Sequence, residues 1–343
     1  MAGRRKKAKV LVFRARFAAT LVDWYRREQR DLPWRGTDDP YRILVSEVML
    51  QQTRAQTVIP YYERFLERFP DVKALAEARE AEVLTYWSGL GYYTRARNLQ
   101  RAARVMVAAG RFPSDYDGIC ELPGVGPYTA AAVASIAFNA PHAVVDGNVL
   151  RVIARLSNDG ADIGSAKTRA RFQRIADAWL DPREPGQFNQ ALMELGASIC
   201  LPRTPRCLLC PVAAFCEGRK AGRQHELPVK RSKAVPLYIQ IQVAIIERDG
   251  AVLLRRRDGT SLMAGFWELP APDDLPSWRP RETLGSFRHT ITHHHYTVTV
   301  LSGTVARVPA GFRWRRDRLD RIPLTTVARK ALRLITQPKL TNV

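Results

Sequence analysis

The clearest shortages in this chain of 343 residues are in long apolar runs, cysteines and acidic residues. No stretch approaches the roughly 18 uninterrupted apolar residues of a membrane-spanning helix, and the basic start over residues 1–10 lacks the apolar segment of a signal peptide. Without a secretory leader, the 5 cysteines are not expected to form disulfides. We therefore expect a soluble cytoplasmic protein with no membrane partner, nucleoid-associated if the source is bacterial.

The shortage of acidic residues leaves a strongly basic chain. There are 33 Asp and Glu against 54 Lys and Arg, which gives a net charge of +21 and a pI near 10.3. Both halves are basic, since residues 227–343 alone carry 20 Lys and Arg against 9 Asp and Glu. This charge favours a polyanionic partner over a small neutral substrate, although a solvated surface or an arginine-rich genome would give the same composition.

The first two thirds of the chain have a helical pattern. Alanine-rich amphipathic stretches cover residues 72–87, 94–109 and 129–138, broken by glycine and proline. Runs of β-branched residues are scarce before residue 226. We expect residues 1–226 to form a helical catalytic domain.

The last third has a different character. Residues 227–236 contain two prolines and three cations, which indicates a linker. Residues 238–247 and 251–256 flank an Asp-Gly turn and predict a β-hairpin. The other expected elements are a strand over residues 296–305 and a closing helix over residues 324–335. We expect residues 237–343 to form a second domain.

Four of the cysteines are close together in the sequence, as Cys200, Cys207, Cys210 and Cys216. Their Cys-x6-Cys-x2-Cys-x5-Cys spacing offers the four soft donors that an iron-sulfur cluster needs. A structural zinc site usually has two close pairs of cysteines, whereas only Cys207 and Cys210 form one here. The loop over residues 200–216 therefore favours a [4Fe-4S] cluster, which could transfer electrons or brace the loop.

A glycine-containing turn precedes one of the alanine-rich helices, over residues 122–130 with the sequence LPGVGPYTA. Gly124 and Gly126 allow backbone N–H groups to approach an anion, and the helix directs its positive end to the same place. A Pro-Gly turn before a helix is also common in any helical protein. Over about residues 118–135 the segment resembles the helix-hairpin-helix motif of DNA repair enzymes, which grips phosphates without reading bases. Leu122, Gly124 and Gly126 are therefore candidate DNA-binding residues.

Asp146 stands at an apolar boundary before a helix expected over residues 149–156. The helix dipole and backbone N–H groups favour an ionised carboxylate there, although a plain N-cap aspartate gives the same pattern. The order of hairpin, aspartate and four-cysteine loop resembles the endonuclease III superfamily of base-excision glycosylases, across residues 30–216. The resemblance implies an all-α helix-hairpin-helix glycosylase domain that carries the iron-sulfur loop.

Within that superfamily the chain resembles the adenine-specific MutY family, because SEVMLQQT, residues 46–53, matches that family's motif for the catalytic acid. Apolar neighbours such as Val45 and Val48 would disfavour the ionised form of Glu47 and hold a proton near neutral pH. A surface salt bridge is the ordinary use of a helical glutamate, but no basic residue stands four positions either side of Glu47.

The resemblance implies a role for each polar group of the catalytic site. Glu47 would protonate the adenine, Asp146 would stabilise the sugar cation and help position water, and Asn148 and Tyr128 would support them. Superfamily members that also nick the strand carry a lysine where this chain has Tyr128, and that amine forms a Schiff base with the sugar. We therefore expect base removal by water without efficient strand cleavage.

The resemblance also names residues that contact the duplex and the extruded base. Gln52 and Tyr92 match positions that wedge into the duplex when the base leaves the stack, although core packing is the commoner role of such an aromatic. The residues that resemble the adenine pocket are Arg30, Trp34, Leu50 and Gln190. Near the cysteine loop, Arg203, Arg206 and Arg219 are expected to contact the DNA backbone.

The C-terminal domain resembles a Nudix-type α/β fold, as in MutY proteins, on the basis of residues 251–270. The acidic helix that binds magnesium in Nudix hydrolases is missing from the following sequence, so we expect binding without hydrolysis. In the family a Phe-Ser-His loop recognises 8-oxoguanine, and this chain has Ile291, Thr292 and His293 there. Thr292 and His293 keep the polar groups, but Ile291 cannot stack as phenylalanine would.

The resemblance as a whole implies a monomeric adenine DNA glycosylase of base-excision repair, which acts on double-stranded DNA with adenine opposite 8-oxoguanine or guanine. A second interpretation is a thymine- or pyrimidine-directed glycosylase of the same superfamily. A third is an iron-sulfur protein that binds DNA without catalysis. That third interpretation gives the Glu47 and Asp146 carboxyl groups no function.

Overall fold

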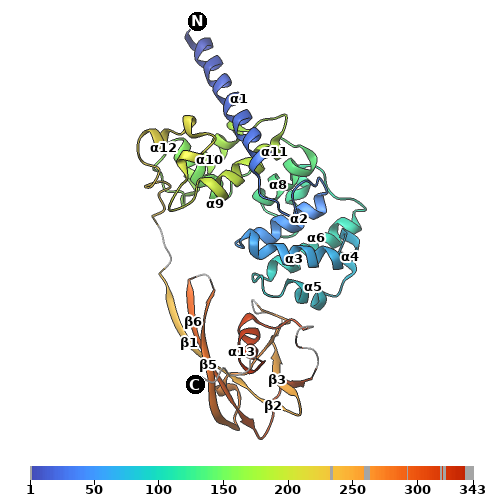
Figure 1. Ribbon diagram of the computed structural model, residues 1–343. Helices are drawn as coiled ribbons and strands as arrows, with labels where there is room; N and C mark the ends of the chain where they lie inside the picture. The colour runs from blue at the N-terminus through green and yellow to red at the C-terminus, as the bar shows by residue number, and fades with distance from the viewer. Residues whose placement is uncertain are drawn as a thin grey trace. The chain divides into compact units, whose positions relative to one another are not determined.

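The computed structural model describes residues 2–231, 235–258, 263–291, 293–316, 319 and 322–336, with side chains from residue 14 onward. The chain forms two compact units (Figure 1). The first unit comprises Met1–Leu66, Asp71–Lys73 and Ala102–Lys233, and the second comprises Glu67–Pro70, Ala74–Arg101 and Ala234–Val343. A helical segment from the first half of the sequence thus groups with the β-rich part, and the domain limits given above remain predictions.

Helices make up the regular structure of the first unit. They are α1 (Ala2–Glu28), α2 (Pro40–Leu50), α3 (Ala55–Arg68), α7 (Tyr116–Cys120), α8 (Pro127–Phe138), α9 (Gly147–Leu156), α10 (Ala166–Trp179), α11 (Pro185–Glu194) and α12 (Glu217–Lys220). A π-helical turn over Leu195–Ile199 extends α11, and two 3-10 turns, Cys207–Leu209 and Ala213–Phe215, lie in the cysteine loop.

Helix α8 lies at the centre of the first unit. Its seven residues from Thr129 to Ser135 are all buried, and their side chains are small. Small side chains allow close packing of the neighbouring helices α2, α7 and α11. A Cβ at Gly186 of α11 would lie only 2.6 Å from the carbonyl oxygen of Ser135, so glycine is required there. This packing brings α2, which carries Glu47, against α8, which carries Tyr128.

The single helix expected over residues 72–87 is two helices, α4 (Val72–Glu77) and α5 (Glu80–Trp87). The break occurs because Arg79 is extended, with φ −70° and ψ 135°, and so begins a new helix. The next helix, α6 (Thr94–Ala108), agrees with the expected bounds to within one residue.

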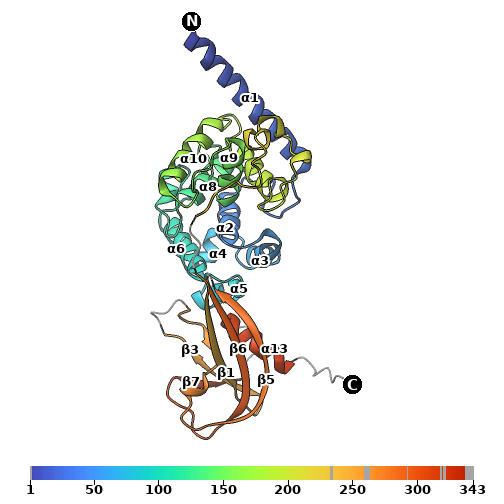
Figure 2. The ribbon, with the colours of Figure 1, turned by 90° about the vertical axis from the view of Figure 1, so that its left-hand side faces the viewer.

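The C-terminal part contains two sheets. Their strands are β1 (Leu237–Ile245), β2 (Glu247–Arg248), β3 (Ala251–Arg256), β4 (Trp267–Glu268), β5 (Trp278–Ile291), β6 (His294–Val305) and β7 (Phe312–Arg315). The long strands β1, β6 and β5 run side by side, with β6 in the middle (Figure 2). Strand β3 pairs with β2, β4 and β7 in the second sheet. Helix α13 (Thr326–Thr336) buries Ala328, Ala331 and Leu332 against the apolar core.

The expected hairpin is only partly correct. Its turn is present, with Asp249 at φ 48° and Gly250 at φ 72°, but only the short strand β2 pairs with β3 across it. Strand β1 instead pairs in parallel with β6, because Val243 and Ile245 join a core with apolar residues of β6. Among the described residues, no helix has the length and apolar character required to cross a membrane.

Candidate active site and cysteine loop

Glu47 is buried on α2, with only 5% of its surface exposed. The hydroxyl of Tyr128 donates a hydrogen bond of 2.8 Å to its Oε2 atom. Burial raises the pKa of Glu47 to about 7, the hydrogen bond from Tyr128 lowers it, and the charge of Asp146 raises it. The carboxyl group is therefore close to half-protonated at neutral pH.

Tyr128 lies in the first turn of α8, beside the small residues Ala131 and Ala132. Burial and the charges of Glu47 and Asp146 raise the pKa of its phenol well above the ordinary value. The phenol thus stays protonated, and its hydroxyl also approaches the sulfur of Met193 at 3.6 Å. Residue 128 therefore provides a hydroxyl group that donates a hydrogen bond, and it does not provide an amine.

Asp146 is the N-cap of α9, which begins at Gly147, two residues before the expected start. Its Oδ1 accepts a hydrogen bond of 2.6 Å from the backbone N–H of Val149, and its Oδ2 accepts one of 3.0 Å from the side chain of Asn148. Burial raises the pKa of Asp146, while these hydrogen bonds and the charge of Arg151 oppose that rise. Both carboxylate oxygens are therefore fixed in direction.

A chain of hydrogen bonds connects Asp146 to the cysteine loop. Asn148 accepts a hydrogen bond of 2.9 Å from Arg151, which also donates to the carbonyls of Gly196 and Cys200 at 2.8 Å each. A Cβ at Gly196 would lie 2.7 Å from that of Asn148, so the glycine permits this close approach. These contacts of Arg151 could not be predicted from the local sequence, because the two carbonyls that it binds lie 45 and 49 residues further along the chain.

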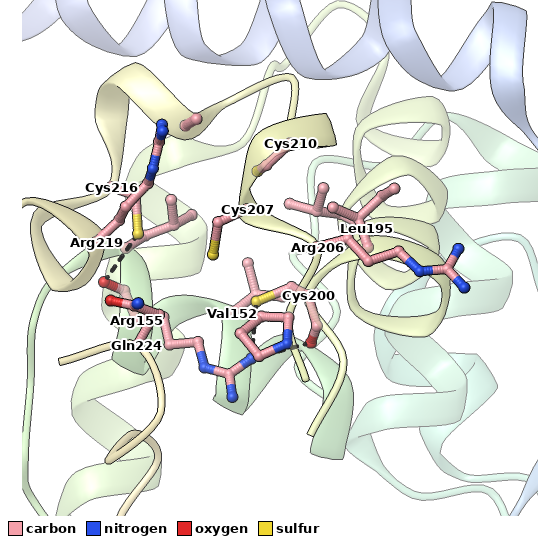
Figure 3. A pocket seen from close by; sticks show the side chains of 14 residues that line it. Val152, Arg155, Leu195, Cys200, Arg206, Cys207, Cys210, Cys216, Arg219 and Gln224 are labelled. Carbon is pink, nitrogen blue, oxygen red and sulfur yellow. Dashed lines mark hydrogen bonds between the residues drawn. The ribbon is translucent and has the colours of Figure 1, made fainter. Parts of the chain in front are cut away.

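The four clustered cysteines line one cavity, and their thiols point into it (Figure 3). None of them forms a disulfide. Burial raises the pKa of Cys210 to about 12 and also raises that of Cys216. Within the described ranges, no three His, Cys, Asp or Glu side chains gather around one metal-ion position.

Arg155 binds the cysteine loop from below in Figure 3 and is 1% exposed. Its guanidinium donates to the sulfur of Cys200 at 3.3 Å and to four carbonyl oxygens. Those carbonyls belong to Cys200, Leu201, Pro202 and Leu227. One side chain therefore fixes the first cysteine and the segment that follows the loop.

The candidate adenine-pocket residues Arg30 and Gln190 both interact with other side chains. Arg30 binds Glu194 through two hydrogen bonds of 2.6 and 2.9 Å, and Arg35 binds the same carboxylate at 2.5 Å. Burial alone would raise the pKa of Glu194, but the two arginines outweigh it and lower that pKa. Gln190 accepts a hydrogen bond of 3.0 Å from Tyr25.

The other two candidate pocket residues differ in burial. Trp34 is 8% exposed and contacts the ring of Tyr62 edge-on at 5.4 Å, whereas Leu50 is half-buried at the end of α2. Sequence reasoning missed Glu194 and its partners, since Arg30 and Glu194 are 164 positions apart.

Two candidate wedge residues have left-handed backbones at exposed turns. Gln52 has φ 56° between α2 and α3, and Tyr92 has φ 49° between α5 and α6. Tyr92 is 44% exposed. A positive φ is uncommon for residues other than glycine, and among the described residues it occurs at these two turns and also at Asn139, Asn158 and Asp249.

The candidate phosphate clamp also has the expected backbone. Gly124 has φ 76°, and Gly126 caps α8 with no atom within 4 Å of the place where a Cβ would stand. Leu122 is 4% exposed, so its side chain is not available to a ligand. In the C-terminal unit His293 is exposed and Ile291 is 48% exposed, while Thr292 lies outside the described residues.

Comparisons with known proteins identify what the chain is similar to. Residues 45–177 match the family described as HhH-GPD superfamily base excision DNA repair protein, and residues 242–334 match the NUDIX domain. The chain is 34% identical over 405 residues to a human adenine DNA glycosylase, covering 93% of this chain and 73% of that protein. It is 41% identical over 339 residues to the Schizosaccharomyces pombe enzyme of that name, covering 80% and 73%.

A solved structure is similar to the helical part. It is that of a thermostable thymine-DNA glycosylase, with a TM-score of 0.54 and 31% identity, covering 61% of this chain and 97% of that one. The fold expected from the sequence, a helix-hairpin-helix glycosylase domain followed by a Nudix-like domain, is confirmed. With relatives of one kind matched over most of its length, the chain belongs to the adenine DNA glycosylase family of base-excision DNA repair enzymes.

Proposed function

We propose that this protein hydrolyses the N-glycosidic bond of adenine in double-stranded DNA, where adenine is paired with 8-oxoguanine or guanine. The observation that carries the proposal is the buried carboxyl group of Glu47, which accepts a hydrogen bond from Tyr128 and whose pKa is raised by burial to about 7. An acid with a pKa near the working pH can donate its proton readily and can also take up a new proton after each reaction. The names of the relatives support adenine as the base.

The hydrogen bonds assign a role to each oxygen. Oε2 of Glu47 accepts from Tyr128, which leaves Oε1 to carry the proton and deliver it to an imidazole nitrogen of adenine. Protonation makes the base a better leaving group, and the sugar then acquires positive charge as the bond to the base breaks. Asp146, held by Val149 and Asn148, stabilises that charge and orients the attacking water.

The same site supports a monofunctional enzyme. Strand cleavage through a Schiff base needs an amine nucleophile, and the position beside Glu47 holds the protonated phenol of Tyr128. Water is therefore the nucleophile and a plain abasic site is the product. The exposed turns at Gln52 and Tyr92 would enter the duplex when adenine is extruded, and His293 would contact the partner base. The protein would act in the cytoplasm or nucleoid, where its substrate lies.

We further propose that the cysteine loop holds a [4Fe-4S] cluster. The donor set fits, since four thiols face one cavity and soft sulfur donors suit iron-sulfur chemistry. The cluster would brace the loop, whose arginines then face DNA phosphates.

Excision from defined duplexes tests the activity. We expect abasic product, cut by alkali, from duplexes with adenine opposite 8-oxoguanine or guanine, and none with thymine opposite guanine. Without alkali the strand should stay intact, and borohydride should trap no adduct. Removal of thymine would instead favour the pyrimidine-directed alternative, and tight binding without product would favour a non-catalytic protein.

Matched variants test the roles of the two acids. Glu47→Gln and Asp146→Asn should each lower the single-turnover excision rate by at least about 100-fold. Glu63→Gln makes the same chemical change at an exposed site of α3 and should leave the rate unaltered. Near wild-type excision by either active-site variant would contradict the mechanism.

Iron and sulfide analysis tests the cluster. The purified protein should contain about four irons and four inorganic sulfides per chain. Cys200→Ser should lower both contents, whereas Cys120→Ser, outside the loop, should not. A single zinc ion per chain would overturn the assignment.

A further inference from the structure

The turn that carries Tyr92 is fixed from within. It joins α5 to α6, and Arg95 donates to the carbonyl of Gly91 at 3.1 Å while lying over the rings of Trp87 and Tyr92. The indole N–H of Trp87 donates to the same carbonyl at 3.2 Å. The left-handed backbone of Tyr92 is therefore held by contacts on the inner side of the turn.

The start of this turn is also bound by the Nudix-like domain. Ser88 is 3% exposed, and its hydroxyl donates to the carbonyl of Leu324 at 3.3 Å. Arg329 of α13 donates to the Ser88 carbonyl at 2.7 Å and to the Ser88 hydroxyl. These residues all belong to the second compact unit. Arg329 is partly buried, and a charged donor makes a strong and directional contact.

The end of the turn is bound by a ring contact. Tyr93 packs on Phe266 with ring centroids 4.1 Å apart, and the two residues are 3% and 0% exposed. One turn of helix further on, Arg97 donates to the carbonyl of Ala264. Ser88 and Tyr93, before and after Tyr92, thus both contact the Nudix-like domain, while Tyr92 itself is left 44% exposed.

We propose that Arg329 and Phe266 of the Nudix-like domain are positioning residues that hold the Tyr92 turn in the conformation that enters DNA. The Nudix-like domain, which is proposed to contact the partner base, would then also fix the conformation of the Tyr92 turn. The inference rests on the wedge role proposed above for Tyr92. It predicts that changes at Arg329 act on DNA binding through Tyr92 rather than through the total charge.

A double-mutant cycle tests this directly. The probe is a duplex with 2′-fluoro-2′-deoxyadenosine, which resists glycosidic cleavage, opposite 8-oxoguanine, and the readout is Kd by fluorescence anisotropy. Arg329→Met keeps the aliphatic stem and should weaken binding by about five- to tenfold. In the Tyr92→Ala background the same change should have an effect of less than about twofold, because the wedge is already absent.

The matched control is Arg313→Met, an exposed arginine of β7 that makes the same charge change away from the turn. Its effect should be small and equal in both backgrounds. Phe266→Leu, a second variant at the other end of the turn, should repeat the cycle if Arg329→Met folds poorly in thermal melts. Additive effects of Arg329 or Phe266 with Tyr92 would overturn the positioning role. Wild-type binding by Tyr92→Ala would overturn the wedge itself, which distinguishes the two failures.

Discussion

The hydrogen bond from Tyr128 to Glu47 leads to a prediction about the pH dependence of excision: removing the bond should raise the pKa of Glu47. The bond favours the ionised carboxylate, so Tyr128→Phe, which removes only the hydroxyl, should raise the pKa of Glu47 above its value of about 7. A hydrogen bond to a charged group contributes about 1.5 to 3 kcal/mol, and one pKa unit corresponds to about 1.4 kcal/mol. Because the protonated acid keeps part of the bond, we expect a rise of about one pKa unit.

The assay is the single-turnover excision rate from pH 5 to pH 9 on the duplex with adenine opposite 8-oxoguanine. A reaction that needs protonated Glu47 slows as pH rises through its pKa, so this limb should move upward by about one pH unit in Tyr128→Phe. Tyr61→Phe, a tyrosine of α3 outside the site, controls for the substitution. An unmoved limb, or one displaced to lower pH, would refute the reasoning.

Three further predictions concern stability and DNA contact. Glu47 keeps a proton that the unfolded chain releases, so its contribution to stability is lost as pH rises from about 4.5 through 7. Glu47→Gln should therefore raise the free energy of unfolding at pH 8 by up to about 3 kcal/mol, seen as a higher melting temperature, and should not raise it at pH 4.5. Gly126→Ala should leave the melting temperature unaltered or slightly higher, because space is open around that position, yet weaken DNA binding several-fold in anisotropy titrations; unweakened binding would remove the phosphate clamp. Glu194→Ala removes the carboxylate that binds Arg30 and Arg35 and should lower the free energy of unfolding by about 3 kcal/mol in denaturant titrations, whereas Glu63→Ala should lower it little.

Local chemistry explains which parts were predictable from the sequence. Asp146 before Gly147 predicts the start of a helix, and Gly124 before Pro127 predicts a turn. Both features depend on only a few adjacent residues. Roles of the acids came from the family resemblance and stay predictions. The pairing of β1 with β6 was not predictable, since register between strands about 57 positions apart depends on the assembled core.

The break within residues 72–87 shows the limit of periodicity. The alanine-rich pattern continues across Arg79, and only the extended backbone there divides α4 from α5. The contacts of Arg151 and of Glu194 were missed for a related reason. Each joins segments far apart in the chain, and an arginine that donates to distant carbonyls resembles any surface arginine in a sequence.

The contacts of Arg155 bear on how natural variants of this chain should be interpreted. A lysine there keeps the charge but offers one compact ammonium in place of a planar fork, and it cannot serve four separate carbonyls at once. A swap that substitution tables rank as mild would therefore leave several buried oxygens without donors. In a protein so rich in arginine, the harm from losing one such residue depends on its acceptors rather than on the sign of its charge.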